Sequence, residues 1–297
     1  MAFHHRTVFL SDCHLGSRGC RARELSRYLG QLRCDRLYLV GDIVDMWRLR
    51  QKWYWPQEHN QVLRQLFALA KDGTEVIFIP GNHDESARQF LHADFGGIKV
   101  LPYAIHHTAD GRRLLVTHGD QFDLVVRHSR FVSMIGAKAY ELLLRVNRVY
   151  NACRVRLSLP QRSLSKAIKA RVKSACMLIS RFEESVVDEA RTRGFDGVVC
   201  GHIHTPAVVA PEDNRGIAYF NCGDWIEGAT AIVEDRDGSM RLVDAAAMLE
   251  RQPVPTPMAT DRLSADAPPV DAMSLAALIS AERIFAPADD ETAVTFH

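Results

Sequence analysis

The sequence predicts an α/β protein with one partly parallel β-sheet and a second sheet packed against it. Strand-like apolar runs alternate with helix-like segments over residues 7–79, which is typical of βαβ units. Two later stretches, 98–116 and 207–243, contain short runs and turns, and we expect them to form the second sheet. Five of the runs stop at a polar motif, and ligand sites in such sheets lie at the carboxyl ends of the strands.

The bulk composition is that of an ordinary soluble globular protein. The 297 residues are 47% hydrophobic and 25% charged, and a net charge of +1 provides no global attraction to nucleic acid, so no nucleic-acid partner is expected. Seven cysteines, an odd number without a C-x-x-C pair, favour a reducing compartment. The chain contains neither a secretory signal pattern nor an apolar stretch of about 18 residues, and we therefore expect a cytoplasmic protein.

The strand-like runs are short, and each stops where a polar motif begins. Helix-like segments near 21–33 and 57–71 separate the first three runs. The five runs are 7–10, 36–40, 75–79, 114–117 and 198–200, and the motifs at their ends are Ser11-Asp12-Cys13-His14, Gly41-Asp42, Gly81-Asn82-His83-Asp84, His118-Gly119-Asp120 and Gly201-His202-Ile203-His204.

These motifs together predict a site for two divalent metal ions. Taken singly, each motif is more simply explained as a turn or a surface histidine, but all of them fall at strand ends. Carboxylate, imidazole and amide oxygen ligands suit Mn²⁺, Fe²⁺ or Zn²⁺, and two such ions can stabilise the attacking and the leaving oxygen of a displacement at phosphorus. Asp42, alone at its strand end, fits the bridging carboxylate. The seven candidate ligands are Asp12, His14, Asp42, Asn82, His118, His202 and His204.

The spacing within two motifs adds a geometric expectation. Residues i and i+2 of an extended chain point to the same side. Asp12 and His14 are therefore expected to face one ion, and His202 and His204 to face one ion as well. Gly41 and Gly201 precede ligands and allow the backbone to turn sharply.

Residues 121–193 are expected to form a helical, basic insertion into a core made of 1–120 and 194–248. Between Arg127 and Lys173 there are twelve Lys and Arg but one acidic residue. Either these cations simply face water, or the segment is an amphipathic lid that holds an anionic or lipid-bearing substrate, and both interpretations remain open. The candidate substrate-binding residues are Arg154, Arg156, Arg162, Lys166, Lys169 and Lys173.

Two further features have less specific interpretations. The aromatic run after Asp42, which is Trp47, Trp53, Tyr54 and Trp55, could anchor the next helix or form a wall beside a nucleoside base. Residues 249–297 shift to Pro, Ala, Thr and Asp, which predicts a disordered tail. The other eight histidines are interpreted as surface or core residues: His4, His5, His59, His92, His106, His107, His128 and His297.

The five motifs together resemble the calcineurin-like metallophosphoesterase superfamily over roughly residues 7–243. The resemblance implies an α/β/β/α sandwich of two mixed sheets flanked by helices, with a helical lid insertion. It implies that His83 contacts the phosphoryl oxygens or protonates the leaving group, and that Asp84 orients His83 and keeps it charged. It also assigns the ligands: Asp12, His14, Asp42 and His204 to the first metal, and Asp42, Asn82, His118 and His202 to the second.

Within that superfamily the chain resembles the UDP-2,3-diacylglucosamine pyrophosphohydrolases of lipid A synthesis. The resemblance rests on Gly41-Asp42-Ile43-Val44-Asp45 with its aromatic run, on the helical insertion, and on Asn221-Cys222-Gly223-Asp224-Trp225. It implies a glycolipid substrate split into UMP and 2,3-diacylglucosamine 1-phosphate, Mn²⁺ as the favoured metal, and peripheral contact with the cytoplasmic face of the inner membrane. One position departs: members of that group carry Arg where this chain has His83, the general phosphoesterase form.

Two alternative functions accompany this hypothesis. The same site could serve another phosphodiesterase or a phosphomonoesterase with a different phosphorylated small molecule as its substrate. Alternatively, the fold could be a non-catalytic scaffold, since some superfamily members have lost site residues. The presence of all seven expected ligands together with His83 argues against a scaffold.

Overall fold

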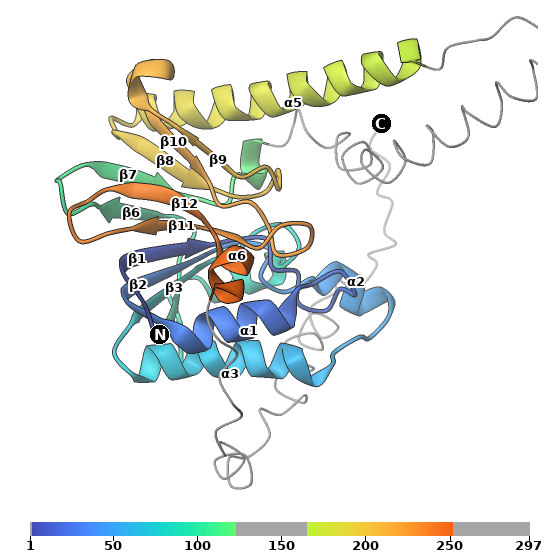
Figure 1. Cartoon of the computed structure of the whole chain (residues 1–297), viewed down its shortest axis with the longest axis vertical. Coiled ribbons are helices and arrows are strands. Elements are labelled where there is room, and N and C mark those ends of the chain that lie inside the picture. The colour runs from blue at the N-terminus through green and yellow to red at the C-terminus, as the bar shows by residue number, and fades with distance from the viewer. Residues whose placement is uncertain (1, 123–164, 252–297) are drawn as a thin grey trace, which may run out of the picture.

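The computed structural model describes residues 2–122 and 165–251, and these form two β-sheets with helices on their outer faces (Figure 1). Side chains are described for 2–122 and 179–251. The strands are β1 (Phe3–Leu10), β2 (Leu32–Val40), β3 (Glu75–Ile79), β4 (Asp94–Phe95), β5 (Ile98–Val100), β6 (Ala104–His107), β7 (Arg113–Val116), β8 (Gly197–Cys200), β9 (Ala207–Val209), β10 (Ala218–Asn221), β11 (Thr230–Glu234) and β12 (Met240–Asp244). The helices are α1 (Ala22–Gln31), α2 (Met46–Gln51), α3 (Gln57–Lys71), α5 (Ser165–Thr192) and α6 (Ala245–Glu250), with 3₁₀ turns η1 (Glu85–Phe90), η2 (Asp120–Phe122) and η3 (Pro211–Asp213).

Both sheets are mixed, and each has parallel strands at its centre. The seven-stranded sheet has the order β12-β11-β1-β2-β3-β5-β4, in which β1, β2, β3 and β5 are parallel neighbours. The five-stranded sheet has the order β6-β7-β8-β10-β9, in which β7, β8 and β10 are parallel. Parallel strands end at a common edge, so the motifs that follow β1, β2 and β3, and those that follow β7 and β8, are brought together.

The strands read as continuous apolar runs because both of their faces are buried. Along β1, Val8 and Leu10 pack into the layer beneath α1 and α3, whereas Phe9 between them points into the layer between the two sheets. The inter-sheet layer is completed from the other side by residues such as Val116 and Val199. Alternation along one strand thus supplies two separate cores.

Helices cover the outer face of each sheet, which gives four layers (Figure 1). On α1 the buried residues Leu25, Tyr28 and Leu29 recur at helical spacing and face the seven-stranded sheet. The C-terminal half of α5 covers the five-stranded sheet through residues that include Phe182 and Val186. Each such apolar side chain stabilises the fold by about 1.5–3 kcal/mol when it is fully buried.

The predicted α/β sandwich is therefore confirmed, but the division of strands between the sheets differs from the expectation. Stretches 98–116 and 207–243 do not all join the second sheet, because β5, β11 and β12 extend the first one. These strands pair with β3, β1 and each other, which are contacts between segments distant in sequence. A local pattern identifies a strand but does not identify its partner.

The described residues cover only part of the predicted insertion and of the predicted tail. Helix α5 lies within the predicted insertion 121–193, while residues 123–164 lie outside the described residues. Helix α6 extends two residues into the predicted tail, and residues 252–297 also lie outside the description.

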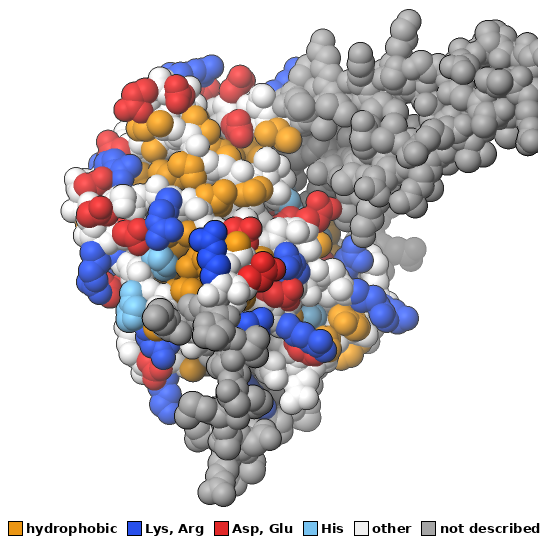
Figure 2. Space-filling view, viewed as in Figure 1, with side chains coloured by type: hydrophobic (Ala, Val, Ile, Leu, Met, Phe, Trp, Pro, Cys, Tyr) orange, Lys and Arg blue, Asp and Glu red, His pale blue; other side chains and the backbone are white. Residues whose placement is uncertain are grey.

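On the face seen in Figure 2, basic and acidic side chains are interspersed rather than separated.

Among the described helices, none combines the length and the hydropathy needed to span a membrane.

Candidate metal centre

Loops that follow strands of both sheets meet at one edge of the sandwich. The amide of Asp12, after β1, donates to the carbonyl of Gly41, after β2, at 3.0 Å. The amide of His202, after β8 in the other sheet, donates to the Asp12 carboxylate at 2.8 Å. These bonds tie the two sheets together where the polar motifs begin.

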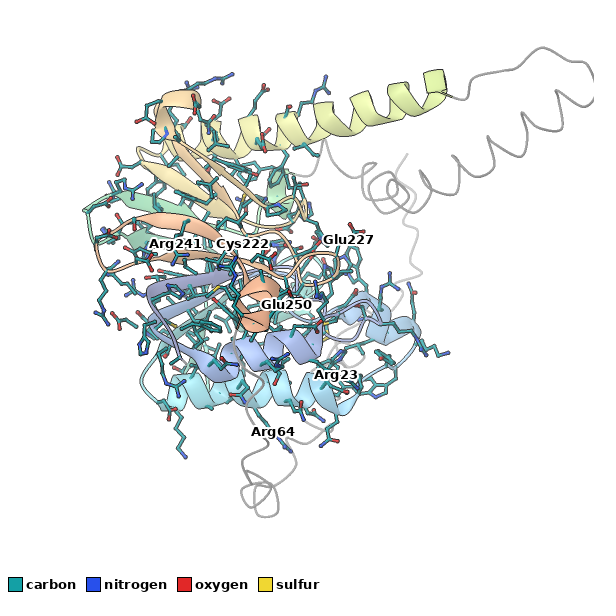
Figure 3. All side chains as sticks on the ribbon, viewed as in Figure 1. Arg23, Arg64, Cys222, Glu227, Arg241 and Glu250 are labelled. Carbon is teal, nitrogen blue, oxygen red and sulfur yellow. The ribbon has the colours of Figure 1, made fainter. Side chains whose placement is uncertain are left out.

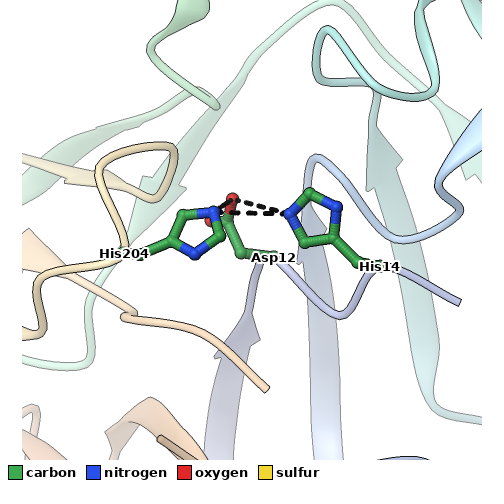
Figure 4. Close-up of side chains that lie close together, drawn as sticks. All are labelled: Asp12, His14 and His204. Atoms are coloured by element: carbon green, nitrogen blue, oxygen red, sulfur yellow. Dashed lines mark hydrogen bonds and ion pairs between the residues drawn. The ribbon is translucent and has the colours of Figure 1, made fainter. Parts of the chain in front are cut away.

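Asp12, His14 and His204 form the first cluster (Figure 4). His204 Nε2 lies 3.0 Å from Asp12 Oδ1, and His14 Nε2 lies 3.7 Å from the same oxygen. The Nε2 atoms of the two histidines face each other at 3.3 Å. Three potential ligand atoms therefore surround one small volume.

Asp42, His118 and His202 form the second cluster, and all three are buried. Asp42 Oδ1 lies 3.4 Å from His118 Nε2, and the rings of His118 and His202 have centroids 5.1 Å apart. Asn82 belongs to the loop after β3, next to His83, whose amide donates to Asp42 Oδ1 at 2.7 Å. The side-chain oxygen of Asn82 is buried and has no hydrogen-bond partner among the described residues.

The carboxylate of Asp42 connects the two clusters. Its Oδ1 faces His118 in the second cluster, while its Oδ2 lies 3.8 Å from His14 Nε2 in the first. One oxygen is thus available to each cluster. This is the arrangement needed for a carboxylate that bridges two cations.

Left-handed backbone conformations, which are uncommon for residues with a side chain, concentrate in this site. Of the seven such non-glycine residues in the described chain, five are candidate ligands, with φ between 49° and 71°: Asp12, His14, Asp42, His202 and His204. Strained conformations of this kind cluster at functional sites, because the surrounding structure holds them in place.

The expectation drawn from extended spacing is confirmed for Asp12 and His14, which lie in one cluster, and is wrong for His202 and His204. His202 lies with Asp42 and His118, whereas His204 lies with Asp12 and His14, so the two histidines face different clusters. Alternation along an extended chain does not apply where the backbone is left-handed. The placement instead matches the ligand sets that the family resemblance implies.

Glycines in the site are required by close packing. A Cβ at Gly81 would lie 2.6 Å from His118 Cδ2 and 2.7 Å from the amide nitrogen of Asp42. A Cβ at Gly201 would collide with the side chains of Ser11 and Asp12. Side chains at these positions would displace candidate ligands.

A second set of groups orients the candidate histidine ligands. His14 Nδ1 donates to Asp45 Oδ2 at 3.3 Å, and His118 Nδ1 donates to the carbonyl of Val40 at 2.9 Å. His204 Nδ1 donates to Asp224 Oδ2 at 3.1 Å. In each case Nδ1 is engaged, which leaves Nε2 directed at the cluster, as in metal-binding histidines generally.

Asp84 does not orient His83, although the family resemblance implied that it would. The His83 Nδ1 contact is to Asp45 Oδ1, at 2.8 Å, and not to Asp84. The Asp84 carboxylate instead accepts four backbone amides, from Gly81, Asp42, Ile43 and Val44, and so joins the loops after β2 and β3. Asp84 is committed to the backbone because its side chain is buried beneath these loops, whereas Asp45 caps α2 beside the His83 ring.

The electrostatics of the clusters favour bound cations. Burial would lower the pKa of His118 and of His204, but the Asp42 and Asp12 carboxylates beside them raise each pKa to about 10. Burial would raise the pKa of Asp12, yet the neighbouring His204 holds it well below the ordinary value. Buried carboxylates thus hold positive charge at the positions that cations would occupy.

The candidate ligands fit two divalent metal ions. The set combines carboxylates, imidazoles and one amide oxygen, which suits borderline divalent cations. The buried Asn82 oxygen without a hydrogen-bond partner and the shared Asp42 carboxylate are accounted for if ions are bound.

The predicted substrate-binding residues lie outside the part of the chain whose side chains the structure describes. Arg154, Arg156 and Arg162 lie outside the described residues, and the side chains of Lys166, Lys169 and Lys173 on α5 are not described.

The aromatic run has divided roles. The ring of Trp47 lies over His83, with centroids 4.3 Å apart, and is 39% exposed. Trp55 packs against His59 and the core beneath α1 and α3. The first residue of the run therefore lines the site, while the last one anchors a helix.

Two functional candidates, Asp45 and Asp224, were not predicted from the sequence. Both stand in motifs on which the family resemblance rests. Asp45 lies three residues after Asp42, and its two carboxylate oxygens contact His14 and His83. Asp224 lies in the loop after β10, and its carboxylate accepts from His204 Nδ1. Closeness in sequence to a ligand was the available signal for Asp45 only, because Asp224 lies 20 residues from His204.

Comparison with known proteins agrees with this geometry. A family model described as calcineurin-like phosphoesterase matches residues 5–206. The chain is 27% identical over 250 residues to a protein named UDP-2,3-diacylglucosamine hydrolase from Xanthomonas campestris pv. campestris (strain B100), covering 78% of this chain and 96% of that protein. A protein of the same name from Edwardsiella ictaluri (strain 93-146) is 26% identical, and the match covers 89% of that protein.

Among solved structures, Vps29 from Entamoeba histolytica aligns with 80% of this chain and 96% of its own, at 13% identity and a TM-score of 0.37. A phosphoesterase-like protein from Streptococcus pneumoniae TIGR4 aligns with a TM-score of 0.32 at 12% identity. The family match spans β1 to the motif after β8, which includes all seven candidate ligands. The chain belongs to the calcineurin-like phosphoesterase family and is a metallophosphoesterase.

Proposed function

We propose that the two clusters hold two divalent cations and that the protein hydrolyses a phosphodiester or pyrophosphate bond between them. The observation that carries this proposal is the position of the Asp42 carboxylate, with one oxygen toward each cluster. A site for a single cation would not need a shared carboxylate. The family relationship supports the same class of reaction.

Each cation would be held by four side chains. Asp12, His14, Asp42 and His204 would hold the first, and Asp42, Asn82, His118 and His202 the second. When bound, the cations supply an activated water as the nucleophile and neutralise charge on the phosphoryl oxygens. Mn²⁺ is the proposed native metal, and the mixed oxygen and nitrogen ligands also suit Fe²⁺ and Zn²⁺.

His83 is proposed to serve the leaving group. Its Nδ1 is held by Asp45, its Nε2 lies 4.0 Å from Asp42 Oδ2, and its side chain is 14% exposed. The oxygen of water bonds to phosphorus, the bond from phosphorus to the leaving oxygen breaks, and the proton on His83 Nε2 passes to that oxygen. The attacking water releases one proton to solvent, and His83 takes up a proton from solvent after the step. In the ground state the same Nε2–H would donate to a phosphoryl oxygen.

The proposed substrate is UDP-2,3-diacylglucosamine, with UMP and 2,3-diacylglucosamine 1-phosphate as products. The names of the related proteins and the motifs shared with that group support this substrate. The helical insertion would then cover the acyl chains, and its basic residues would pair with phosphate. The protein would act in the cytoplasm, in peripheral contact with the inner membrane. Amphipathic segments with a basic polar face bind to membrane surfaces.

One observation favours a second candidate. His83 occupies the position where members of that group carry Arg, and it is the residue found in general phosphoesterases. A phosphodiesterase or phosphomonoesterase with another phosphorylated substrate therefore remains the alternative function.

A substrate panel with Mn²⁺ distinguishes these proposals. The purified protein would be given UDP-2,3-diacylglucosamine, bis-p-nitrophenyl phosphate and p-nitrophenyl phosphate, and the products identified by mass spectrometry. Release of UMP at the highest kcat/KM supports the glycolipid substrate. Turnover of the aryl esters without UMP release supports the alternative, and a protein that binds no metal and hydrolyses none of the three would be a scaffold.

A further inference from the structure

A cavity of about 220 Å³ opens beside the second cluster. His118 forms part of its wall, so the cavity adjoins a candidate metal ligand. Its other polar side chains are Arg88 from η1, Asp120 and Gln121 from η2, and Thr117. Asp12, His14 and His204 of the first cluster do not line this cavity.

The guanidinium of Arg88 is held in a defined position at this cavity. Its Nη2 donates to Asp120 Oδ2 at 2.6 Å and to the carbonyl of Pro80 at 3.3 Å. The Asp120 side chain is 11% exposed, and that of Arg88 is 43% exposed. Pro80 and Asp120 belong to the loops that carry Asn82 and His118, so the position of Arg88 is coupled to the second cluster.

Arg88 retains hydrogen-bonding capacity after these contacts. Both contacts use Nη2, and in the part of the chain that the structure describes Nε and Nη1 donate to no other residue. These two nitrogens carry the three remaining donors of the guanidinium, and each can donate to a phosphate oxygen. A pre-positioned guanidinium also loses less side-chain entropy on binding.

The chemistry of the substrate class supplies a ligand for this group. A simple phosphodiester carries one negative charge, which the cations would neutralise, whereas a pyrophosphate diester carries a second phosphate next to the one attacked. We propose that Arg88 binds this second, unattacked phosphate, so that the cavity selects pyrophosphate diesters over single phosphodiesters. This inference rests on the proposed function and narrows its substrate class.

Equilibrium binding to two unreactive probes tests the inference. The Mn²⁺-loaded full-length protein would be titrated by calorimetry with diphenyl methylenediphosphonate, which carries two phosphonates, and with phenyl methylphosphonate, which carries one. Arg88→Ala should raise the Kd for the diphosphonate about tenfold, as expected for a charge-assisted hydrogen bond at a partly exposed site. The Kd for the monophosphonate should change less than twofold, and Arg88→Lys should lie between wild type and Arg88→Ala.

Arg241→Ala is the matched control. Arg241, labelled in Figure 3, is 50% exposed and pairs with Asp235 at 2.9 Å, but it lies on β12 and does not line the cavity. It should leave both Kd values unchanged. Equal weakening of both probes by Arg88→Ala, or no weakening of either, would overturn the subsite while leaving the hydrolase proposal intact.

Kinetics give an independent result. With pyrophosphate substrates, Arg88→Ala should raise KM more than it lowers kcat, while kcat/KM for bis-p-nitrophenyl phosphate stays within twofold. If the wild-type protein hydrolysed aryl phosphodiesters but did not bind the diphosphonate, the subsite would be wrong and the proposed function would stand. If it neither bound metal nor hydrolysed any ester, the proposed function itself would fail.

Discussion

Buried carboxylates face histidines in two regions of this molecule, and the two regions balance their charges differently. Between the sheets, Glu234 accepts two hydrogen bonds from Arg6 Nη1, at 2.6 and 2.7 Å, and one from His106 Nε2 at 2.9 Å. The amide of Ala109 adds another at 2.7 Å. The charge of this buried carboxylate is therefore met entirely by groups of the protein.

At the metal centre, by contrast, the groups that the structure places against Asp12 and Asp42 include His14, His118 and His204. The pKa values show the consequence. Burial lowers the pKa of His106 beside Glu234, while the carboxylates raise the pKa of His118 and His204 to about 10.

The difference separates a structural from a functional use of buried charge. A network that contains its own cation, Arg6, is complete and stabilises the packing of the two sheets. In the clusters of the metal centre the carboxylates stabilise the protonated forms of the neighbouring histidines, and bound cations would replace those protons. The same residue types thus have a structural role where Arg6 supplies the positive charge, and a candidate metal-binding role where histidines face the carboxylates.

The largest effect is expected from Asp42→Asn at the metal centre. Loss of the shared carboxylate should lower kcat on bis-p-nitrophenyl phosphate on the order of a thousandfold, since charge stabilisation at phosphorus is removed. Metal analysis should show fewer than two ions per chain. Activity within tenfold of wild type, with two ions retained, would show that Asp42 is not the bridge.

The corresponding change in the other region, Glu234→Gln, should affect stability and spare catalysis. Leaving Arg6 and His106 without their charged partner should lower the free energy of unfolding by about 3 kcal/mol. The kcat on the same ester should stay within twofold, because Glu234 is not among the residues of the candidate metal clusters. A large loss of activity in folded protein would break the distinction between the regions.

The pH dependence of stability sharpens that result. Burial would raise the pKa of Glu234, but its hydrogen bond to His106 and those to its other partners lower it from 4.5 to about 2. A carboxylate with a depressed pKa contributes stability above its unfolded pKa and loses it as the pH falls toward the folded one. Denaturant titrations should therefore show wild type losing stability between about pH 4.5 and pH 2, and Glu234→Gln losing less over that window.

A smaller effect is expected from Asp45→Asn, which tests whether the groups around the ligands matter. Asp45 orients both His14 and His83, so its loss should reduce kcat/KM about 10- to 100-fold, with weaker metal binding. The matched control is Asp244→Asn, because both carboxylates cap a helix and accept the amide three residues on. The control should cost about 1 kcal/mol of stability at most and leave activity unchanged; equal losses of activity in the two variants would reduce Asp45 to a helix cap.

Much of the fold and most of the site could be predicted from the chain alone, because both depend on local features. Runs such as 76–79 are apolar throughout since a strand buried on both faces has no polar face. The polar motifs stand at strand ends because the chain turns there, and their residue types identified metal chemistry and the family.

Other features could not be predicted because they depend on contacts between distant segments. The pairing of β11 with β1 moved a predicted second-sheet strand into the first sheet. His83 Nδ1 contacts Asp45 rather than its neighbour Asp84. The reason is that Asp84 faces backbone amides where the loops after β2 and β3 pack together.

The sequence by itself determined which strands form, where they end, and which side chains stand at those ends, because apolar periodicity and turn residues act over a few positions. Tertiary structure alone decided the loop geometry by which His202 and His204 face different clusters and one oxygen of Asp42 faces each cluster, and it alone placed Arg88 at a cavity beside His118. The physical reason is that left-handed backbone at the strand ends is imposed by neighbouring loops from both sheets, and those loops meet only when the sheets pack together.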